Sequence, residues 1–199
     1  MSQPMHYLKE TASQTAGPYV HIGLAPGDAG FDIYRQEIGR NIVGANPKGT
    51  AITVTGLVTD GNGDPVKDVL IEVWQADADG LYPSKGGTQE GFRGWGRVVP
   101  DFESGEFSFN TIKPGPVLDD MVLTMAPHLN LWLVARGINV GLNTRLYFDD
   151  EPEANAADPV LNLIESSQRR DTLVARKQDT GYRFDISLQG DAETVFFDV

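Results

Sequence analysis

The sequence predicts an all-β protein built as an antiparallel β-sandwich, with an extended N-terminal arm and little helix. Three observations lead to this fold class. About seven short segments alternate apolar and polar residues with the two-residue period of a β-strand. Gly, Pro or Asp stands at most of the intervals between these segments, as tight connections require. The first fifty residues show neither a sustained strand period nor a sustained helix period.

The domain organisation follows from length and composition. With 199 residues and 40% hydrophobic composition, the chain is long enough for one buried core and short for two independent domains. We therefore expect residues 1–199 to form a single domain. Residues 1–50, which contain Gly and Pro at short intervals, are predicted to be the extended arm, and residues 51–199 the β-sandwich.

The predicted elements follow in order along the chain. The first strand ends in the turn-forming run DGNGDP, and the second, VLIEVWQ, places Val69, Ile71 and Val73 on one face. The full set of expected strands is 51–58, 69–75, 105–112, 129–136, 143–148, 182–188 and 193–199. One helix is expected over residues 159–176, covering an end of the sandwich.

Charge and composition exclude several classes of function. The formal net charge of −12, with no run of Lys or Arg, disfavours partners with phosphate backbones or anionic lipid headgroups. The absence of cysteine excludes disulfides and thiolate metal sites. No segment has the length of apolar residues that a membrane helix needs, and the N-terminus lacks the apolar core of a secretory signal. We expect a cytoplasmic protein.

Common catalytic motifs are also missing. The sequence contains no G-x-S-x-G elbow and no P-loop lysine. The acidic run that begins near Asp149 does not have the spacing of an EF-hand. A solvated loop is the simpler interpretation of that run.

Histidine and tyrosine offer a possible metal site. His128 and Asn130 stand two residues apart at the start of a predicted strand, so their side chains share one face. Tyr82 follows the loop glycine Gly80, where a phenol can be a metal ligand or a half-buried aromatic. On spacing alone, an ordinary polar pair at a strand entry is the commoner interpretation of His128 and Asn130.

Several motifs, in the same order, resemble those of the intradiol aromatic-ring dioxygenase family, from about Thr11 to Val199. The segments are SQTAGPYVHIGL, VKDVLIEVWQADADGLY, FSFNTIKPGP, MAPHLNL, NTRLYFDDE, LNLIE and YRFDISLQG. Catalytic chains of that family hold a ferric ion with two tyrosines and two histidines. Tyr82 and His128 match the first of each, whereas Val117 and Asn130 replace the second tyrosine and the second histidine.

The resemblance therefore implies a chain without a complete iron site. Fe(III) is a hard cation that favours phenolate oxygen and imidazole, and valine supplies no donor. We expect no metal in this chain and treat Tyr82, Val117, His128 and Asn130 as vestigial positions. No catalytic residue is expected in the isolated chain, which should be inactive.

The same resemblance implies a partner. In two-chain members of the family, the iron-free chain pairs with an iron-bearing beta chain in a hetero-oligomer and completes its substrate pocket. Fe(III) in the partner then cleaves the carboxylated catechol protocatechuate with O2 to 3-carboxy-cis,cis-muconate. Carried over by motif, the pocket-lining residues of this chain are Thr15, Gly17 and Pro18 in the arm, and Arg136. A guanidinium at the mouth would attract the substrate carboxylate.

Two alternatives remain open on sequence grounds. The chain could be a self-sufficient iron dioxygenase in which Tyr82 and His128 recruit other donors, such as Tyr147 or His21. It could instead be a β-sandwich binding module of transthyretin-like architecture with no link to an enzyme. Arg136 also has a plain interpretation as a surface ion-pair residue.

Overall fold

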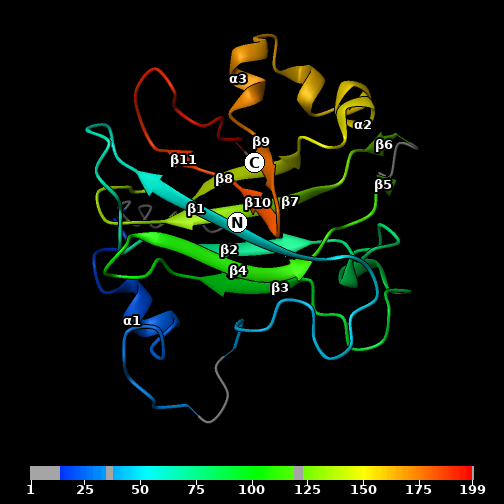
Figure 1. Ribbon diagram of the computed structural model, residues 1–199. Coiled ribbons are helices and arrows are strands. Elements are labelled where there is room, and N and C mark those ends of the chain that lie inside the picture. The colour runs from blue at the N-terminus through cyan, green and yellow to red at the C-terminus, as the bar shows by residue number, and fades with distance from the viewer. Residues whose placement is uncertain (1–13, 35–37, 119–122, 199) are drawn as a thin grey trace, which may run out of the picture.

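The computed structural model describes residues 14–34, 38–118 and 123–198 (Figure 1). The protein is mostly β with little helix. The strands are β1 Ala51–Thr59, β2 Leu70–Gln75, β3 Trp95–Val98, β4 Glu106–Ile112, β5 Val117–Leu118, β6 Thr124–Met125, β7 His128–Val134, β8 Leu142–Phe148, β9 Val174–Gln178, β10 Gly181–Arg183 and β11 Ile186–Ser187. The helices are α1 Val20–Leu24, α2 Pro152–Ala157 and α3 Ser167–Asp171, with 3₁₀ turns η1 Pro83–Lys85 and η2 Leu161–Leu163.

One sheet of nine strands dominates the described part of the chain. Its order is β4, β1, β10, β9, β8, β7, β2, β3, and β11 also pairs with β1. The two outer strands of this order, β3 and β4, contact each other, so the sheet curls until it is nearly closed. In Figure 1, α2 and α3 lie on one side of the sheet and α1 on the other.

The pairing is mixed, which corrects the purely antiparallel arrangement expected from sequence. β1 pairs with β4 antiparallel but with β10 and β11 parallel, and β8 pairs with β9 parallel. The predicted strand 182–188 is divided into β10 and β11, and both parts pair along β1. Short alternating segments carry no signal for strand direction, since the face that each side chain occupies is the same in both.

Two predicted elements at the C-terminal end are wrong. The helix expected over 159–176 is instead η2, then α3, then strand β9. Ile164 adopts an extended backbone after η2, and the Ser166 hydroxyl accepts a hydrogen bond from the Arg169 amide, which starts a new helix. The strand expected over 193–199 is reduced to a single bridge between Phe197 and Asn143.

The main core lies inside the curled sheet. It consists of buried aliphatic and aromatic side chains from both halves of the strand order: Ile52, Val54, Val58, Ile71, Val73, Phe107, Phe109, Leu129, Leu131, Leu133, Leu146, Phe148, Tyr182, Phe184 and Ile186. A smaller cluster of Ala126, Tyr147, Leu161 and Leu173 lies under α2 and η2. Even-numbered residues of β7 therefore point away from the main core, as the two-residue period predicts.

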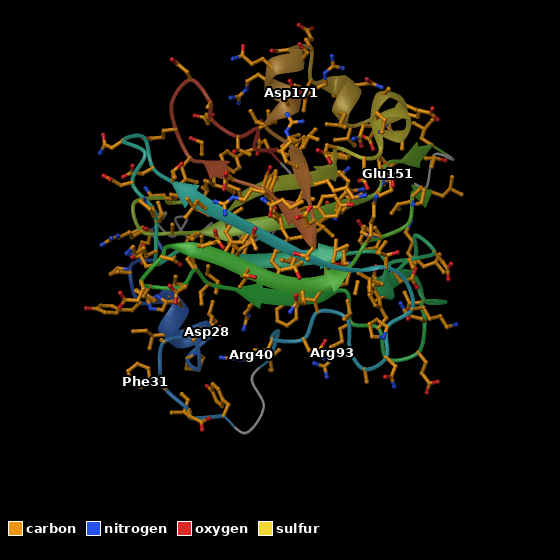
Figure 2. All side chains as sticks on the ribbon, viewed as in Figure 1. Asp28, Phe31, Arg40, Arg93, Glu151 and Asp171 are labelled. Atoms are coloured by element: carbon orange, nitrogen blue, oxygen red, sulfur yellow. The ribbon has the colours of Figure 1, made fainter. Side chains whose placement is uncertain are left out.

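The segment before the sheet is not uniformly extended. Residues 20–24 form helix α1 within the predicted arm, and the Arg97 amide donates to the Gly39 carbonyl at 3.0 Å. Asp28 and Arg40, labelled with Phe31 in Figure 2, form an ion pair of 2.8 Å. Residues 1–13 of the predicted arm lie outside the described residues. Among the described residues, no helix has the length and hydropathy that crossing a membrane requires.

Candidate functional site

Three of the four vestigial positions meet in one hydrogen-bonded cluster. The Tyr82 hydroxyl lies 3.1 Å from Nε2 of His128, and the Asn130 amide donates to the same hydroxyl at 2.8 Å. Asn130 also donates to the Trp74 carbonyl at 3.3 Å. The fourth position, Val117, is buried and pairs with Met125 in the small β5 and β6 ribbon. The cluster therefore satisfies its polar groups internally.

The loop that presents Tyr82 is fixed by Asp77. Its buried carboxylate accepts hydrogen bonds from the amides of Asp79 and Leu81 at 3.0 Å and from the Gln89 amide at 3.1 Å. Gly80 adopts a positive φ of 79°, and a Cβ there would collide with the Pro116 carbonyl. Tyr82 then stacks on Trp74 with ring centroids 5.8 Å apart.

His128 is a neutral, buried imidazole. Its Nδ1 lies 2.7 Å from the Ala126 carbonyl, so Nδ1 donates the proton and Nε2 accepts from Tyr82. Burial, and then the positive charge of Arg145, lower the pKa of His128 to about 4, although the Ala126 hydrogen bond opposes the shift. The histidine therefore carries no charge near neutral pH.

These donors do not fit a ferric ion. Burial raises the pKa of Tyr82 above its usual value, even though the Asn130 hydrogen bond and the Arg145 charge oppose that shift. The set offers one phenol and one imidazole, whereas the Asn130 carboxamide is a weak neutral donor and Val117 has no donor atom, so the site lacks the second phenolate and the second imidazole that Fe(III) favours. Across the described residues, no group of three or more His, Asp or Glu side chains is placed to hold a metal ion.

The other donors considered for a self-sufficient iron site do not join the cluster through a hydrogen bond, although the rings of Tyr147 and His128 lie 5.7 Å apart. The Tyr147 hydroxyl donates to Asp158 at 3.2 Å and accepts from Arg145 at 3.3 Å. His21 is buried beside Phe102, with ring centroids 5.0 Å apart. Neither side chain has a hydrogen bond to the Tyr82 hydroxyl or to the His128 ring in the described structure.

A second group of predicted residues gathers at the other end of β7. The Thr15 hydroxyl donates to the Ala135 carbonyl at 3.1 Å, which holds the arm beside Arg136. Pro18 and Arg136 line the same cavity of about 460 Å³. Gly17 has a positive φ of 75°, which glycine adopts without strain, and thereby turns the chain from Thr15 toward this cavity.

Two buried polar atoms of residues that line this cavity have no protein partner. Nδ1 of His21 and Oδ1 of Asp68 are both buried without a hydrogen bond in the described structure. Oδ2 of Asp68 forms an ion pair of 3.1 Å with Nε of Arg136, whose side chain remains 66% exposed. Arg136 therefore does form an ion pair, as one of its two interpretations predicted.

Sequence reasoning missed Asp68 and did not assign a role to His21. Asp68 is one acidic residue before a strand, and His21 lies in a segment without periodicity, so neither position had a local signal. Only the fold brings them to Arg136. The two clusters lie at opposite ends of β7, about 25 Å apart at roughly 3.3 Å per residue.

The chain is similar to known proteins over nearly its whole length. A family profile described as Dioxygenase matches residues 32–190. The protocatechuate 3,4-dioxygenase alpha chain of Pseudomonas putida is 51% identical over 199 residues, covering 98% of this chain and 99% of that one. The alpha chain from Burkholderia cepacia is 41% identical over 98% of this chain and 100% of its own. The beta chain from Burkholderia cepacia is 34% identical over 95% of this chain and 83% of its own.

Solved structures share the fold. Hydroxyquinol 1,2-dioxygenase from Pseudomonas putida DLL-E4 matches with a TM-score of 0.58 and 20% identity, over 78% of this chain and 63% of that one. Catechol 1,2-dioxygenase from Pseudomonas arvilla C-1 matches with a TM-score of 0.55 and 19% identity, over 77% of this chain and 58% of that one. At these identities the likeness establishes the fold alone.

Proposed function

The chain belongs to the intradiol dioxygenase family, and we propose that it is the iron-free alpha-type subunit of a two-chain protocatechuate 3,4-dioxygenase. In this proposal it pairs with a beta-type chain that binds Fe(III), and together they cleave protocatechuate with O2. The similarity to both alpha and beta chains supports two related subunits in one assembly. Because the chain belongs to an enzyme family, the alternative of a binding module with no link to an enzyme is not favoured.

The observation that carries the proposal is the donor set at the four positions, where Tyr82 and His128 keep a phenol and an imidazole but Asn130 offers only a carboxamide. The Tyr82 hydroxyl lies 2.8 Å from the Asn130 amide and 3.1 Å from the His128 imidazole, so these three side chains face one point. With Val117 in the remaining position, the chain lacks both the donors and the negative charge for iron. Fe(III) in the complex therefore belongs to the partner.

Arg136 and the arm form the part of the proposal that concerns substrate. We assign Thr15, Gly17, Pro18 and Arg136 to the mouth of the partner's pocket. The Thr15 contact to Ala135 ties the arm to the strand end that bears Arg136. Nε of Arg136 pairs with Asp68 at 3.1 Å while the side chain stays 66% exposed, and a guanidinium can bind a second carboxylate through its other N–H groups.

The mechanism assigned to this chain is electrostatic and geometric. The partner's iron supplies the activation of the catechol toward O2. Arg136 holds the substrate carboxylate and offsets the overall negative charge of the chain, which would otherwise repel an anion. Gly17 and Pro18 bring main chain close to the partner without a long side chain, which narrows the mouth and limits water.

The finer structural assignments belong to the same proposal. The nearly closed sheet would be the β-sandwich of the family within one domain, and residues 1–50 would be the arm that reaches the partner. The cytoplasmic location expected from the sequence is retained as part of this proposal.

Co-expression with an iron-bearing beta-type chain tests the function. The beta chain carries the affinity tag, and copurification, iron content and O2 uptake with protocatechuate are measured for the complex and for the beta chain alone. We expect this chain to copurify and the complex to consume O2 faster than the beta chain alone. Absence of copurification, or equal rates per iron, would refute the accessory role.

A further inference from the structure

A cavity of about 580 Å³ lies on the outer face of β2, β3, β7 and β8, away from the arm and Arg136. Its floor is a row of cross-strand neighbours that runs from Trp95 to Trp74, Asn130 and Arg145. The next row includes Glu72 and Trp132, and Glu72 pairs directly opposite Trp132. Adjacent strands are about 4.8 Å apart, so this face is wide enough for a single aromatic ring.

The walls of the cavity are unusually aromatic. The chain contains three tryptophans, and Trp74, Trp95 and Trp132 all line this cavity. Trp132 is 36% exposed although its indole is large and apolar. Phe197, held over β8 by its bridge to Asn143, adds another aromatic wall. Aromatic walls with few polar groups are typical of sites for flat, apolar ligands.

Arg145 supplies one positive group at the end of this aromatic floor. One terminal nitrogen donates to the Tyr147 hydroxyl at 3.3 Å and approaches Sδ of Met125 at 3.4 Å. In the described structure its guanidinium forms no ion pair with a carboxylate, and its Nε and other terminal nitrogen have no partner. Burial raises the pKa of Tyr82 and lowers that of His128, and the charge of Arg145 opposes the first shift and adds to the second, so Arg145 acts on groups of this same face.

The acidic residues around the cavity differ in how far they are neutralised. Glu72 is paired with Arg97 at 2.8 Å and accepts from the Trp95 indole at 3.5 Å. Asp198 lines the rim and is exposed, so its charge is screened by solvent. Arg145 is thus the cavity's one charged lining group, among the described residues, that lies partly buried without an ionic partner.

We propose that this cavity binds a single-ring aromatic carboxylate without a metal, with the ring between the tryptophans and the carboxylate on Arg145. A guanidinium binds a carboxylate through two parallel hydrogen bonds, and the Asn130 amide lies on the row between Trp74 and Arg145. The site is separate from the mouth around Arg136. It is a binding site only, and it does not depend on the proposed accessory role.

Intrinsic fluorescence of the full chain, purified without a partner, tests this directly because every tryptophan lines the cavity. Benzoate is the probe, and benzamide is the neutral control of the same shape. We expect saturable quenching by benzoate and at least about tenfold weaker binding of benzamide, as loss of a charge-assisted pair implies. Equal binding of the two, or no saturation up to about millimolar benzoate, would overturn the proposal.

Variants locate the binding. Arg145→Gln should weaken the binding of benzoate about tenfold or more. Two control variants should leave the affinity for benzoate unchanged: Arg176→Gln, at an exposed position of β9, and Arg136→Gln, outside this cavity. If Arg145→Gln does not fold, Trp132→Leu on the cavity rim replaces it and should weaken both probes. Loss of benzoate binding in Arg136→Gln, or its retention in Arg145→Gln, would place the ligand elsewhere and refute the site.

Discussion

The two ends of strand β7 differ in how their polar groups are satisfied. At its start, the Tyr82 hydroxyl bonds to both His128 and Asn130, and the three side chains are largely enclosed. Past its other end, Arg136 is mostly exposed, and Asp68 and His21 each leave a buried atom without a protein partner. Buried polar groups in folded proteins are normally paired. The first cluster is therefore complete within the chain, whereas the second leaves the largely exposed Arg136 side chain accessible to groups from outside the chain.

This contrast separates a structural role from a functional one on the same strand. Tyr82, His128 and Asn130, which stand where metal ligands would, form a hydrogen-bonded cluster. Substitutions in this cluster should therefore alter the stability of the chain. Residues at the arm should alter what the assembly does with substrate. The predictions below, from largest expected effect to smallest, either sharpen or break that division.

Restoring two donors should give the closed cluster a metal site. In the Val117→Tyr, Asn130→His double variant, the phenol and imidazole join Tyr82 and His128, and we expect about one iron per chain with visible tyrosinate-to-iron absorption. Each single variant should bind iron more weakly than the double variant, because only three of the four protein donors are then present. Iron content and absorption are measured on the purified chain. A double variant that folds, by circular dichroism, but stays iron-free would refute the ligand argument.

Acid should destabilise the chain through His128. Its pKa is lowered to about 4 in the folded protein, against about 6.5 when unfolded. Within that window the unfolded chain binds the additional proton, so the free energy of unfolding should fall as the pH drops, by about 3 kcal/mol in total. Urea unfolding at several pH values measures this loss.

A control separates His128 from the carboxylates. Burial raises the pKa of Asp150, but hydrogen bonds from Lys177, Lys113 and Tyr182 lower it by more. The net result is a pKa of about 2. The stabilising contribution of Asp150 is lost only below about pH 4. His128→Leu should therefore flatten the profile between pH 4 and 6.5. An unchanged slope there would show that another group is responsible.

Arg136→Ala in the assembled enzyme should raise KM for protocatechuate about tenfold and change KM for catechol, which lacks the carboxylate, much less. The matched control is Arg176→Ala, an exposed arginine of β9. Steady-state O2 uptake with both substrates provides the measurement. Equal effects on the two substrates would assign Arg136 to subunit contact rather than to the carboxylate.

Tyr82→Phe should have the smallest effect and only on stability. The variant removes the hydroxyl that links His128 and Asn130, but Asn130 keeps its hydrogen bond to Trp74. We expect a loss of about 1 kcal/mol in the free energy of unfolding and unchanged activity of the complex. A large loss of activity in a stable complex would mean that the vestigial cluster acts in catalysis.

The sequence predicted the strands well where alternation was sustained. Strands β1, β2, β4, β7 and β8 fall close to the expected ranges because one face of each is buried in the core. It failed at residues 159–176, where Leu161, Ile164 and Leu173 mimic a helical stripe. Those side chains pack into the smaller core from a 3₁₀ turn, a loop and the approach to β9 instead.

The candidate sites show the same limit. Motif order identified Tyr82, Val117, His128 and Asn130, and the strand period correctly put His128 and Asn130 on one face. The contact between Thr15 and Ala135 joins residues 120 positions apart, and the Asp68 ion pair to Arg136 has no sequence signature. The tryptophan-lined cavity also depends on register between four strands, which local periodicity cannot supply.

The iron content of this chain, purified without any partner and then offered Fe(III), tests the central claim most directly. Absorption in the visible range is recorded with metal analysis after removal of free iron. The account predicts a colourless chain with no bound iron and no O2 uptake with catechols. Stoichiometric iron with tyrosinate-to-iron absorption in the unmodified chain would contradict it, because Tyr82, His128 and Asn130 would then be ligands rather than partners of one another.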